Sequence, residues 1–340
     1  MKKLLNTLYI STQGIYLNRE GETVVASLDR QPKLRLPIHT LSGIVCFGNV
    51  LCSPFLLGLC GERGVKVSFL TEHGRFLARV EGPVSGNVLL RYEQIRRTMD
   101  PEAALELAKN FVLGKVINSR TVIQRALRDH GDNLELQSAS TTLVNIVRRV
   151  PNAKNIDVLR GYEGEAANAY FGAFNGLIVA QKKHFSMQTR SRRPPLDPLN
   201  ALLSFLYVIL AHDCSSALEG VGLDPQVGFL HALRPGRPSL ALDLMEEFRS
   251  ILVDRVVLTL INRQQISGRD FSTSESGSVI MKDDARKLVL KTWQEKKQET
   301  LKHPFLGERI SIGLLPHLQA LLLARHLRGD IDAYPPFLLK

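Results

Sequence analysis

The sequence has no long apolar run, no paired cysteines and no excess of acidic residues, and each absence excludes a class of protein. The longest apolar stretch, residues 201–211, is interrupted by Ser204. It is shorter than the about 20 residues that span a bilayer, so no membrane association is expected. No long apolar segment or cleavage site follows the basic start Met1-Lys2-Lys3, which argues against a secretory leader. The four cysteines form neither a Cys-x-x-Cys pair nor a zinc-binding spacing, and they predict free thiols in a reducing, cytoplasmic location.

The charge balance is strongly basic. Lys and Arg number 44 against 33 Asp and Glu, which gives a formal net charge of +11 over 340 residues. The excess is spread along the chain in local clusters rather than gathered in a tail. A polyanionic partner is therefore expected, nucleic acid before a membrane surface. The chain is long enough for two domains with a sizeable core.

The pattern of apolar residues changes along the chain and predicts an α+β fold. Residues 1–85 are predicted to form a β-sheet domain, residues 86–99 a linker, and residues 100–340 a larger all-α-helical domain. The predicted strands cover residues 7–10, 14–18, 23–28, 33–36, 43–47, 65–70 and 75–80, with a hairpin turn at 18–22. One short helix is expected at residues 54–60, ended by Gly61. Asp100-Pro101-Glu102 is a strong helix start, because Asp caps, Pro suits the first helical position and Glu favours the positive end of the dipole.

A helix is expected around Glu163, where two glycines flank the carboxylate. Gly161 and Gly164 would each cost about 0.5–1 kcal/mol relative to alanine, which suggests that something approaches the backbone closely. Glu163 lies one residue away from an expected buried stripe formed by Tyr162, Ala166, Ala169 and Ala173. A carboxylate there is costly unless it is paired, protonated or bound to a metal. A surface glutamate on a small-residue helix explains this stretch equally well.

Two further groups come from residues 227–263. His231 ends an apolar run before a Pro/Gly turn, although most lone histidines in such places are structural. Residues 240–263 are predicted to form a helix that is apolar nearly all round and therefore enclosed. Asp243 and Glu246 are three residues apart and share a face of it. Asp243 is explained by its place in the first turn, where it complements the dipole; that explanation is weaker for Glu246, deeper in the helix.

Basic residues gather on two predicted loops. The first precedes Pro194-Pro195, which prevents helix formation, and it has no acidic residue. Basic side chains on such a loop suit contacts with phosphate, and the alternative is a solvated linker. The candidate DNA-binding residues on the two loops are Lys182, Lys183, Arg190, Arg192 and Arg193, then Arg234 and Arg237 on the turn after His231.

Glu163, His231 and Glu246 invite one common explanation, although spacing alone does not bring them together. Two carboxylates and an imidazole suit a hard or borderline divalent ion such as Mg²⁺ or Mn²⁺. Zinc usually recruits more nitrogen or sulfur ligands. A divalent ion beside basic loops points to phosphoryl chemistry on nucleic acid.

Four sequence blocks carry a resemblance to a known family. They are residues 160–164 (RGYEG), 193–204 (RPPLDPLNALLS), 228–231 (GFLH) and 240–249 (LALDLMEEFR). In order and spacing they resemble the signature blocks of the CRISPR-associated spacer-acquisition integrases, the Cas1 family. Residues 4–9 (LLNTLY) and 328–337 (RGDIDAYPPF) extend the resemblance over the whole chain and are similar to the subtype I-C branch.

The resemblance implies an architecture and a set of partners. It implies an N-terminal β domain that forms a homodimer and a larger helical catalytic domain. It also implies double-stranded and branched DNA as substrates, and the small second Cas protein as a partner in an integration complex.

The resemblance also implies an activity and its residues. The family's metal ligands fall on Glu163, His231 and Glu246, where several relatives have Asp at the last position, and Asp243 matches a supporting acidic position. The implied activity is metal-dependent insertion of short foreign DNA into a CRISPR array, by attack of a 3′-hydroxyl on a phosphodiester. The alternatives are a general metal-dependent nuclease acting on branched or single-stranded DNA and a non-catalytic basic DNA-binding scaffold.

Overall fold

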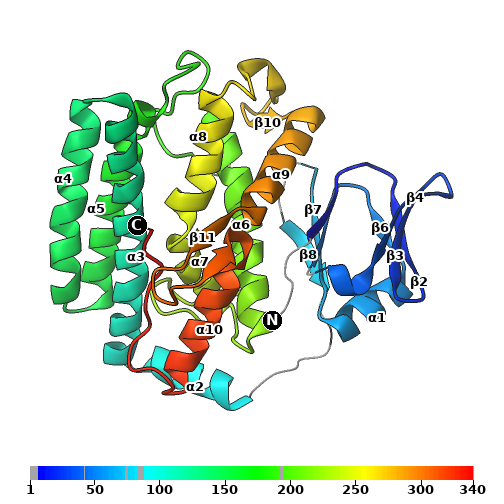
Figure 1. Cartoon of the computed structure of the whole chain (residues 1–340), viewed down its shortest axis with the longest axis horizontal. Helices are drawn as coiled ribbons and strands as arrows, with labels where there is room; N and C mark the ends of the chain where they lie inside the picture. Colours follow the sequence, from blue (N-terminus) through cyan, green and yellow to red (C-terminus); the bar gives the residue numbers. More distant parts are fainter. Residues whose placement is uncertain are drawn as a thin grey trace. The chain divides into compact units, whose positions relative to one another are not determined.

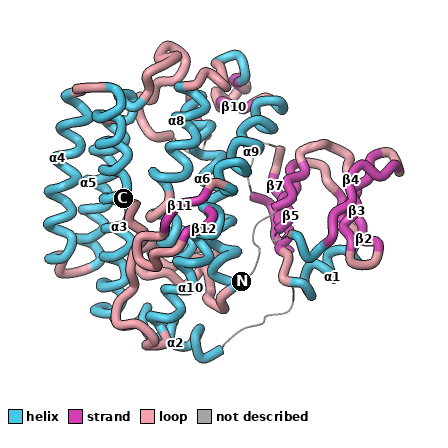
Figure 2. The backbone as a smooth tube through the Cα atoms, in the orientation of Figure 1, coloured by secondary structure: helices cyan, strands magenta, loops and turns pink. Residues whose placement is uncertain are grey.

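The chain forms two compact units, residues Met1–Gly86 and Asn87–Lys340 (Figure 1). A computed structural model describes residues 7–41, 43–72, 76–80, 82, 88–191 and 194–339. The first unit is rich in strands and the second is mainly helical, so the expected α+β class is confirmed (Figure 2).

The first unit contains two four-stranded sheets around an apolar core. One sheet has the order β1-β5-β7-β8, in which β1, β5 and β7 are parallel and β8 is antiparallel to β7. The other has the order β4-β3-β2-β6. The strands are β1 Thr7–Ile10, β2 Tyr16–Glu20, β3 Thr23–Leu28, β4 Gln31–Pro37, β5 Gly43–Phe47, β6 Leu51–Cys52, β7 Lys66–Leu70 and β8 Phe76–Val80. Inward side chains such as Leu17, Val24 and Ile44 form the core with Leu56 of helix α1 (Pro54–Arg63).

The predicted β2–β3 hairpin is confirmed, with Glu20 paired to Thr23 across the turn. The predicted end of α1 at Gly61 is wrong. The helix continues to Arg63 and ends at Gly64, which has the left-handed φ of 67° that favours glycine. Gly61 has another purpose, because a Cβ there would lie 2.9 Å from the Cα of Gly82. It allows two backbone segments to pass in contact.

The second unit is a helical bundle in which several long helices begin at side-chain caps. Asp100 caps α3 by accepting hydrogen bonds from the N–H groups of Glu102 and Ala103, as its sequence predicts. Asn155 caps α5 and Asp197 caps α6 in the same way. The helices are α2 Val88–Met99, α3 Pro101–His130, α4 Leu134–Arg149, α5 Ile156–Gly172, α6 Pro198–Gly220, α7 Ser239–Glu246, α8 Arg255–Asn262, α9 Asp283–Gln298 and α10 Leu315–Leu327.

Three expectations for this unit need correction. The segment 86–99 is not simply a linker, because it contains α2, whose buried Gln94 donates hydrogen bonds to the carbonyls of Asp224 and Val227. The unit is not all helical, since it contains the hairpins β9 (Phe271–Thr273)–β10 (Val279–Met281) and β11 (Thr300–Lys302)–β12 (Arg309–Ser311).

The third correction concerns residues 240–263, which do not form one regular helix. A π-helical turn, Arg249–Asp254, separates α7 from α8. Such wide turns occur often at functional sites.

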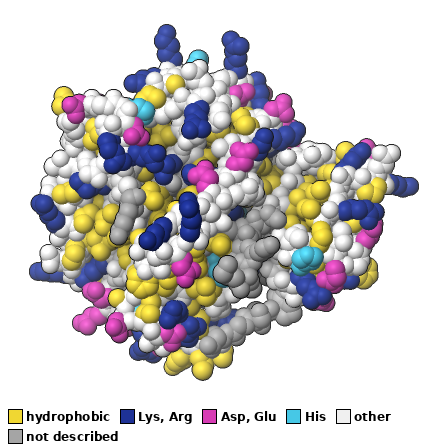
Figure 3. Space-filling view, in the orientation of Figure 1, with side chains coloured by type: hydrophobic (Ala, Val, Ile, Leu, Met, Phe, Trp, Pro, Cys, Tyr) yellow, Lys and Arg dark blue, Asp and Glu magenta, His cyan; other side chains and the backbone are white. Residues whose placement is uncertain are grey.

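Helix α6 is the apolar centre of the second unit and packs against α7 and α10. By length and composition it could cross a membrane, but 67% of its most apolar window is buried inside the structure, as in a core helix. Lys and Arg side chains are spread over the visible face of the helical unit rather than gathered in one patch (Figure 3). The four cysteines are free thiols, as predicted.

Candidate active site

Asp243 organises the loop that presents His231. Its carboxylate is fully buried and accepts hydrogen bonds from the N–H groups of Phe229 (2.7 Å), Leu230 (3.0 Å) and His231 (3.0 Å). It also lies 2.6 Å from Nδ1 of His231. Gly228 permits this arrangement, because a Cβ there would lie 2.8 Å from Asp243 Oδ2. Because a carboxylate oxygen accepts, Nδ1 of His231 donates to Asp243, and Nε2 is the ring nitrogen on the side of Glu246.

Glu163 and Glu246 converge on one cation, the ammonium of Lys115. Glu163 comes from α5, Glu246 from the last residue of α7 and Lys115 from the middle of α3. The ammonium contacts Glu163 Oε1 and lies 2.9 Å from Glu246 Oε2. His231 Nε2 is 4.0 Å from the other oxygen of Glu246, and Arg249 Nε is 3.2 Å from the same oxygen. The structure thus brings the three predicted residues into one cluster, together with two cations.

The electrostatic environment keeps Glu246 ionised. Its residue is only 3% exposed, and burial alone would raise the pKa of its carboxyl group. The positive charges of Arg249 and Lys115 outweigh burial and lower this pKa to about 2. Arg249 is itself fixed in place, because its guanidinium lies 4.7 Å from the ring centroid of Tyr207. Glu246 is therefore an anion sheltered from water, a state that requires a cation beside it.

The donor set of this cluster fits a divalent cation. Glu163 and Glu246 supply carboxylate oxygens and His231 supplies Nε2, and Nδ1 of the same ring bonds to Asp243, as metal-bound histidines usually do. Among the described residues, Oε2 of Glu246 is buried without a hydrogen bond, and its one charged neighbour is the ammonium of Lys115 at 2.9 Å. Within the part of the chain that the structure describes, no three acidic, His or Cys side chains already surround one point at metal-binding distance. The ammonium of Lys115 stands between the two carboxylates.

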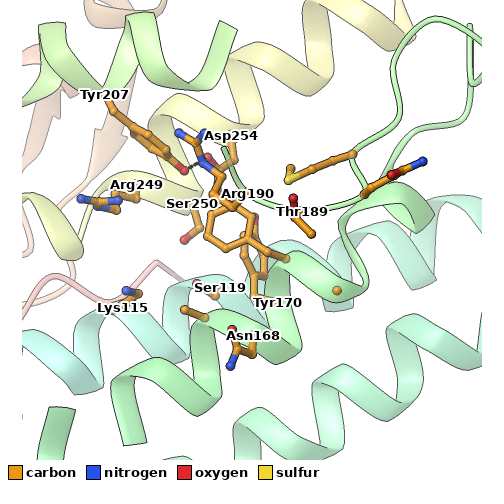
Figure 4. Close-up of a pocket in the computed structure, with 15 residues that line it drawn as sticks. Lys115, Ser119, Asn168, Tyr170, Thr189, Arg190, Tyr207, Arg249, Ser250 and Asp254 are labelled. Atoms are coloured by element: carbon orange, nitrogen blue, oxygen red, sulfur yellow. Dashed lines mark hydrogen bonds between the residues drawn. The ribbon is translucent and has the colours of Figure 1, made fainter. Parts of the chain in front are cut away.

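A cavity of about 320 Å³ adjoins the cluster (Figure 4). Its polar lining includes Lys115, Tyr170, Tyr207, Arg249, Ser250 and Asp254. Asp254 accepts hydrogen bonds from the hydroxyls of Tyr170 (2.9 Å) and Tyr207 (2.5 Å). Burial raises the pKa of the Asp254 carboxyl to about 6, against the lowering effect of these hydrogen bonds. The hydroxyl of Ser250 is buried in the lining and has no hydrogen-bond partner among the residues that the structure describes.

The sequence reasoning missed these lining residues, although a signal for some of them was present. Glu246, Arg249, Ser250 and Asp254 recur at i, i+3, i+4 and i+8, which marks one polar stripe on an otherwise apolar segment. Lys115 gives a weaker signal, because it is a charge among the buried residues of α3. Its contacts lie 48 and 131 residues away in sequence, with Glu163 and Glu246.

The glycines beside Glu163 have no explanation within the described chain. A Cβ built at Gly161 or at Gly164 meets no atom within 4 Å. The close approach expected from the sequence is therefore not supplied by the described residues of the protein itself.

The predicted DNA-binding residues differ in their surroundings. Lys182, Lys183 and Arg234 are exposed, and Arg237 is half-buried. Arg190 is engaged inside the chain, where it donates hydrogen bonds to Asn200 Oδ1 and Ser204 Oγ. The remaining two candidates, Arg192 and Arg193, lie outside the described residues.

Comparison with known proteins identifies the family. The family model described as CRISPR associated protein Cas1 matches residues 8–295. A protein from Chlorobaculum tepidum named CRISPR-associated endonuclease Cas1 1 is 56% identical over 99% of each chain. A solved structure titled casposase bound to integration product has the same fold, with a TM-score of 0.84 and 24% identity over 99% of this chain and 95% of the other. A second, titled Cas6-RT-Cas1–Cas2 complex, has a TM-score of 0.85 and 22% identity over 98% of this chain and 36% of the other. The chain therefore belongs to the Cas1 family of CRISPR-associated endonucleases.

Proposed function

We propose that this Cas1 endonuclease inserts short DNA duplexes into a CRISPR array by strand transfer at the Glu163–Glu246 cluster, with Mg²⁺ or Mn²⁺ as the cofactor. One observation carries the proposal. Two carboxylates from separate helices converge on a single cation position, and an imidazole nitrogen oriented by Asp243 lies 4.0 Å from one of them. Two carboxylates and an imidazole brought together from distant segments are the donor set that a hard or borderline divalent ion takes.

Each side chain has a distinct part in this chemistry. Glu163, His231 and Glu246 would hold the cation, while Asp243 fixes the ring of His231 so that Nε2 points to the site. The bound ion would activate the attacking 3′-hydroxyl and neutralise charge on the phosphorane-like transition state. Arg249, beside Glu246, places a second fixed positive charge where a phosphate would enter. Hydrolytic nicking uses the same groups with water as the nucleophile.

Phosphate contacts outside the cluster are assigned to exposed basic residues. Lys182, Lys183 and Arg234 are open to solvent and can reach a DNA backbone, with Arg237 on the same turn as Arg234. Arg190 is better suited to holding its loop against α6, because its guanidinium already bonds to two side chains of that helix. Arg192 and Arg193 keep the DNA-binding role that their sequence predicts.

The assembly proposed is a homodimer formed through the first unit, joined by the small second Cas protein. Tyr16 and Leu51 are register partners on β2 and β6, so their side chains share a face, and both are exposed. Phe55, at the start of α1, is 78% exposed. Exposed apolar side chains of this kind suit an interface between copies. The subtype I-C assignment rests on the terminal motifs and is part of the same proposal.

The assembly is tested by light scattering of the full chain carrying Leu51→Glu and Phe55→Glu. We expect a monomer where the unmodified chain is a dimer, because two buried carboxylates at a two-fold interface repel each other. A dimer that persists would place the interface elsewhere.

The catalytic proposal is tested with purified protein, the second Cas protein, a short DNA duplex and a supercoiled CRISPR plasmid, supplying each metal in turn. Integration should require Mg²⁺ or Mn²⁺ and should be lost on chelation and in Glu163→Ala, while DNA affinity changes little. Full integration by Glu163→Ala, or in excess chelator, would leave a DNA-binding scaffold as the better account.

A further inference from the structure

Lys115 occupies the position that a cofactor cation needs. Its side chain is 12% exposed, and its ammonium contacts Glu163 and lies 2.9 Å from Glu246. Neither contact is local, since α3, α5 and α7 meet here. The three side chains, Lys115, Glu163 and Glu246, are called the lysine clamp below.

The backbone of α3 is shaped to deliver Lys115 to this point. A Cβ at Gly114 would lie 2.9 Å from Cγ of Glu247 and 3.4 Å from Cβ of Pro336. The absence of a side chain therefore lets α3 lie directly against the end of α7. One residue later, Lys115 projects between the two carboxylates.

In the metal-free protein, Lys115 compensates the negative charges of Glu163 and Glu246. Glu246 is a buried carboxylate, and Glu163 is a second carboxylate in contact with the same cation. Without a positive charge between them, the two groups would repel each other and one would be buried without compensation. The ammonium meets this need with one charge, and it takes up the same oxygens that a divalent ion would bind.

We propose that Lys115 is an internal counter-cation that a divalent ion displaces from Glu163 and Glu246, an inference that rests on the proposed metal site. The ammonium and a divalent ion would compete for the same two carboxylates, because each would need their negative charge and the two cations would repel each other at close range. The apparent metal affinity is then the intrinsic affinity multiplied by the fraction of molecules in which the clamp is open. In the metal-free state Lys115 holds the two carboxylates in position. The adjoining cavity, which Lys115 also lines, gives the released ammonium room to move.

The test is Mn²⁺ binding to full-length protein, measured by electron paramagnetic resonance, with thermal unfolding in parallel. Lys115→Met should bind Mn²⁺ more tightly, by about tenfold if the clamp is closed in nine molecules of ten. Its metal-free form should unfold at a lower temperature than wild type, and Mn²⁺ should raise that temperature by more than it does in wild type. Lys109→Met is the matched control, because Lys109 lies on the same helix and pairs with Glu106 instead.

A merely structural lysine would give a different result, namely lower stability with unchanged or weaker Mn²⁺ binding, and that would overturn the proposal. If Lys115→Met does not fold, amine acetylation of the wild-type chain followed by mass spectrometry gives the answer. Lys115 should be protected without metal and become reactive with Mn²⁺; equal protection in both states overturns the proposal. Absence of Mn²⁺ binding to both wild type and Lys115→Met would overturn the metal site as well.

Discussion

Glu246 and Glu247 are consecutive in sequence and both are buried, yet their surroundings are opposite. Glu246 faces the cations Lys115 and Arg249, and its pKa is about 2. Within the described part of the chain, Glu247 accepts hydrogen bonds from neutral donors: the hydroxyl of Tyr334 (2.6 Å), the N–H of Phe337 (2.7 Å) and the amide of Gln319 (3.0 Å). Burial raises the pKa of Glu247 to about 8 despite these bonds.

The comparison shows that burial alone does not mark a functional carboxylate. For these two glutamates the neighbouring charges make the difference: cations lower the pKa of Glu246, whereas Glu247, among neutral donors, keeps the raised pKa that burial gives it. Glu247 accordingly fastens the C-terminal segment to the bundle. Glu246, one residue earlier and on the other side of the chain, serves the candidate active site.

The largest expected effect comes from exchanging the two glutamates for glutamine, one at a time. Glu246→Gln should lower the integration rate by about 10²–10³-fold or more, the size of loss seen when one electrostatic group of a transition state is removed. Glu247→Gln should keep most of the wild-type rate at neutral pH. Integration kinetics on the plasmid substrate measure both, and equal losses in the two variants would erase the distinction.

The next effect is on stability and concerns Glu247 alone. Its folded pKa of about 8 lies above its ordinary 4.5, so the folded protein holds a proton that the unfolded chain releases. Glu247 therefore contributes to the free energy of unfolding in full below pH 4.5. This contribution falls as the pH rises from 4.5 to 8, by as much as about 5 kcal/mol. Glu247→Gln should remove that slope from denaturant unfolding measured across this range. An identical slope in wild type and variant would mean that Glu247 is ionised in the folded state.

A smaller effect is expected from Asp243, which would act on the metal only by orienting His231. Asp243→Asn replaces the carboxylate that orients the imidazole, and the loss of such an outer partner costs about 10–100-fold in metal affinity or activity. The Mn²⁺ concentration for half-maximal integration should rise accordingly. An unchanged concentration would show that Asp243 only stabilises the loop.

The smallest effect should separate DNA binding from chemistry. Lys182→Ala with Lys183→Ala removes two exposed charges and should reduce the slope of log affinity against log salt by about 0.9 for each lost phosphate contact. Binding to duplexes of different sequence should weaken equally. The rate at which bound DNA is integrated should not change. A constant slope would mean that these lysines belong to a solvated loop.

Local patterns in the sequence predicted the elements whose determinants are local. Strands β1, β3 and β5 follow from short apolar runs between turn residues, and the start of α3 follows from Asp100-Pro101. Helix α2 was not predicted because its apolar residues do not mark its buried face. Tyr92 and Met99 are exposed, while the polar Gln94 is buried.

The candidate site divides in the same way. Glu163 and Glu246 could be selected because a carboxylate among apolar neighbours is costly at its own position in the sequence. Lys115 could not be linked to them, since its meeting with both depends on how α3, α5 and α7 pack. The π-helical turn after α7 is a similar case, because no single residue in 249–254 dictates the extra width of the turn.

The central claim is that Glu163, His231 and Glu246 hold one divalent cation while Glu247 does not. It is tested most directly by Mn²⁺ binding, measured by electron paramagnetic resonance on wild type, Glu246→Gln and Glu247→Gln. The account predicts saturable binding to the wild type and to Glu247→Gln at pH 7, and strongly weakened binding to Glu246→Gln. Undiminished Mn²⁺ binding by Glu246→Gln would contradict it.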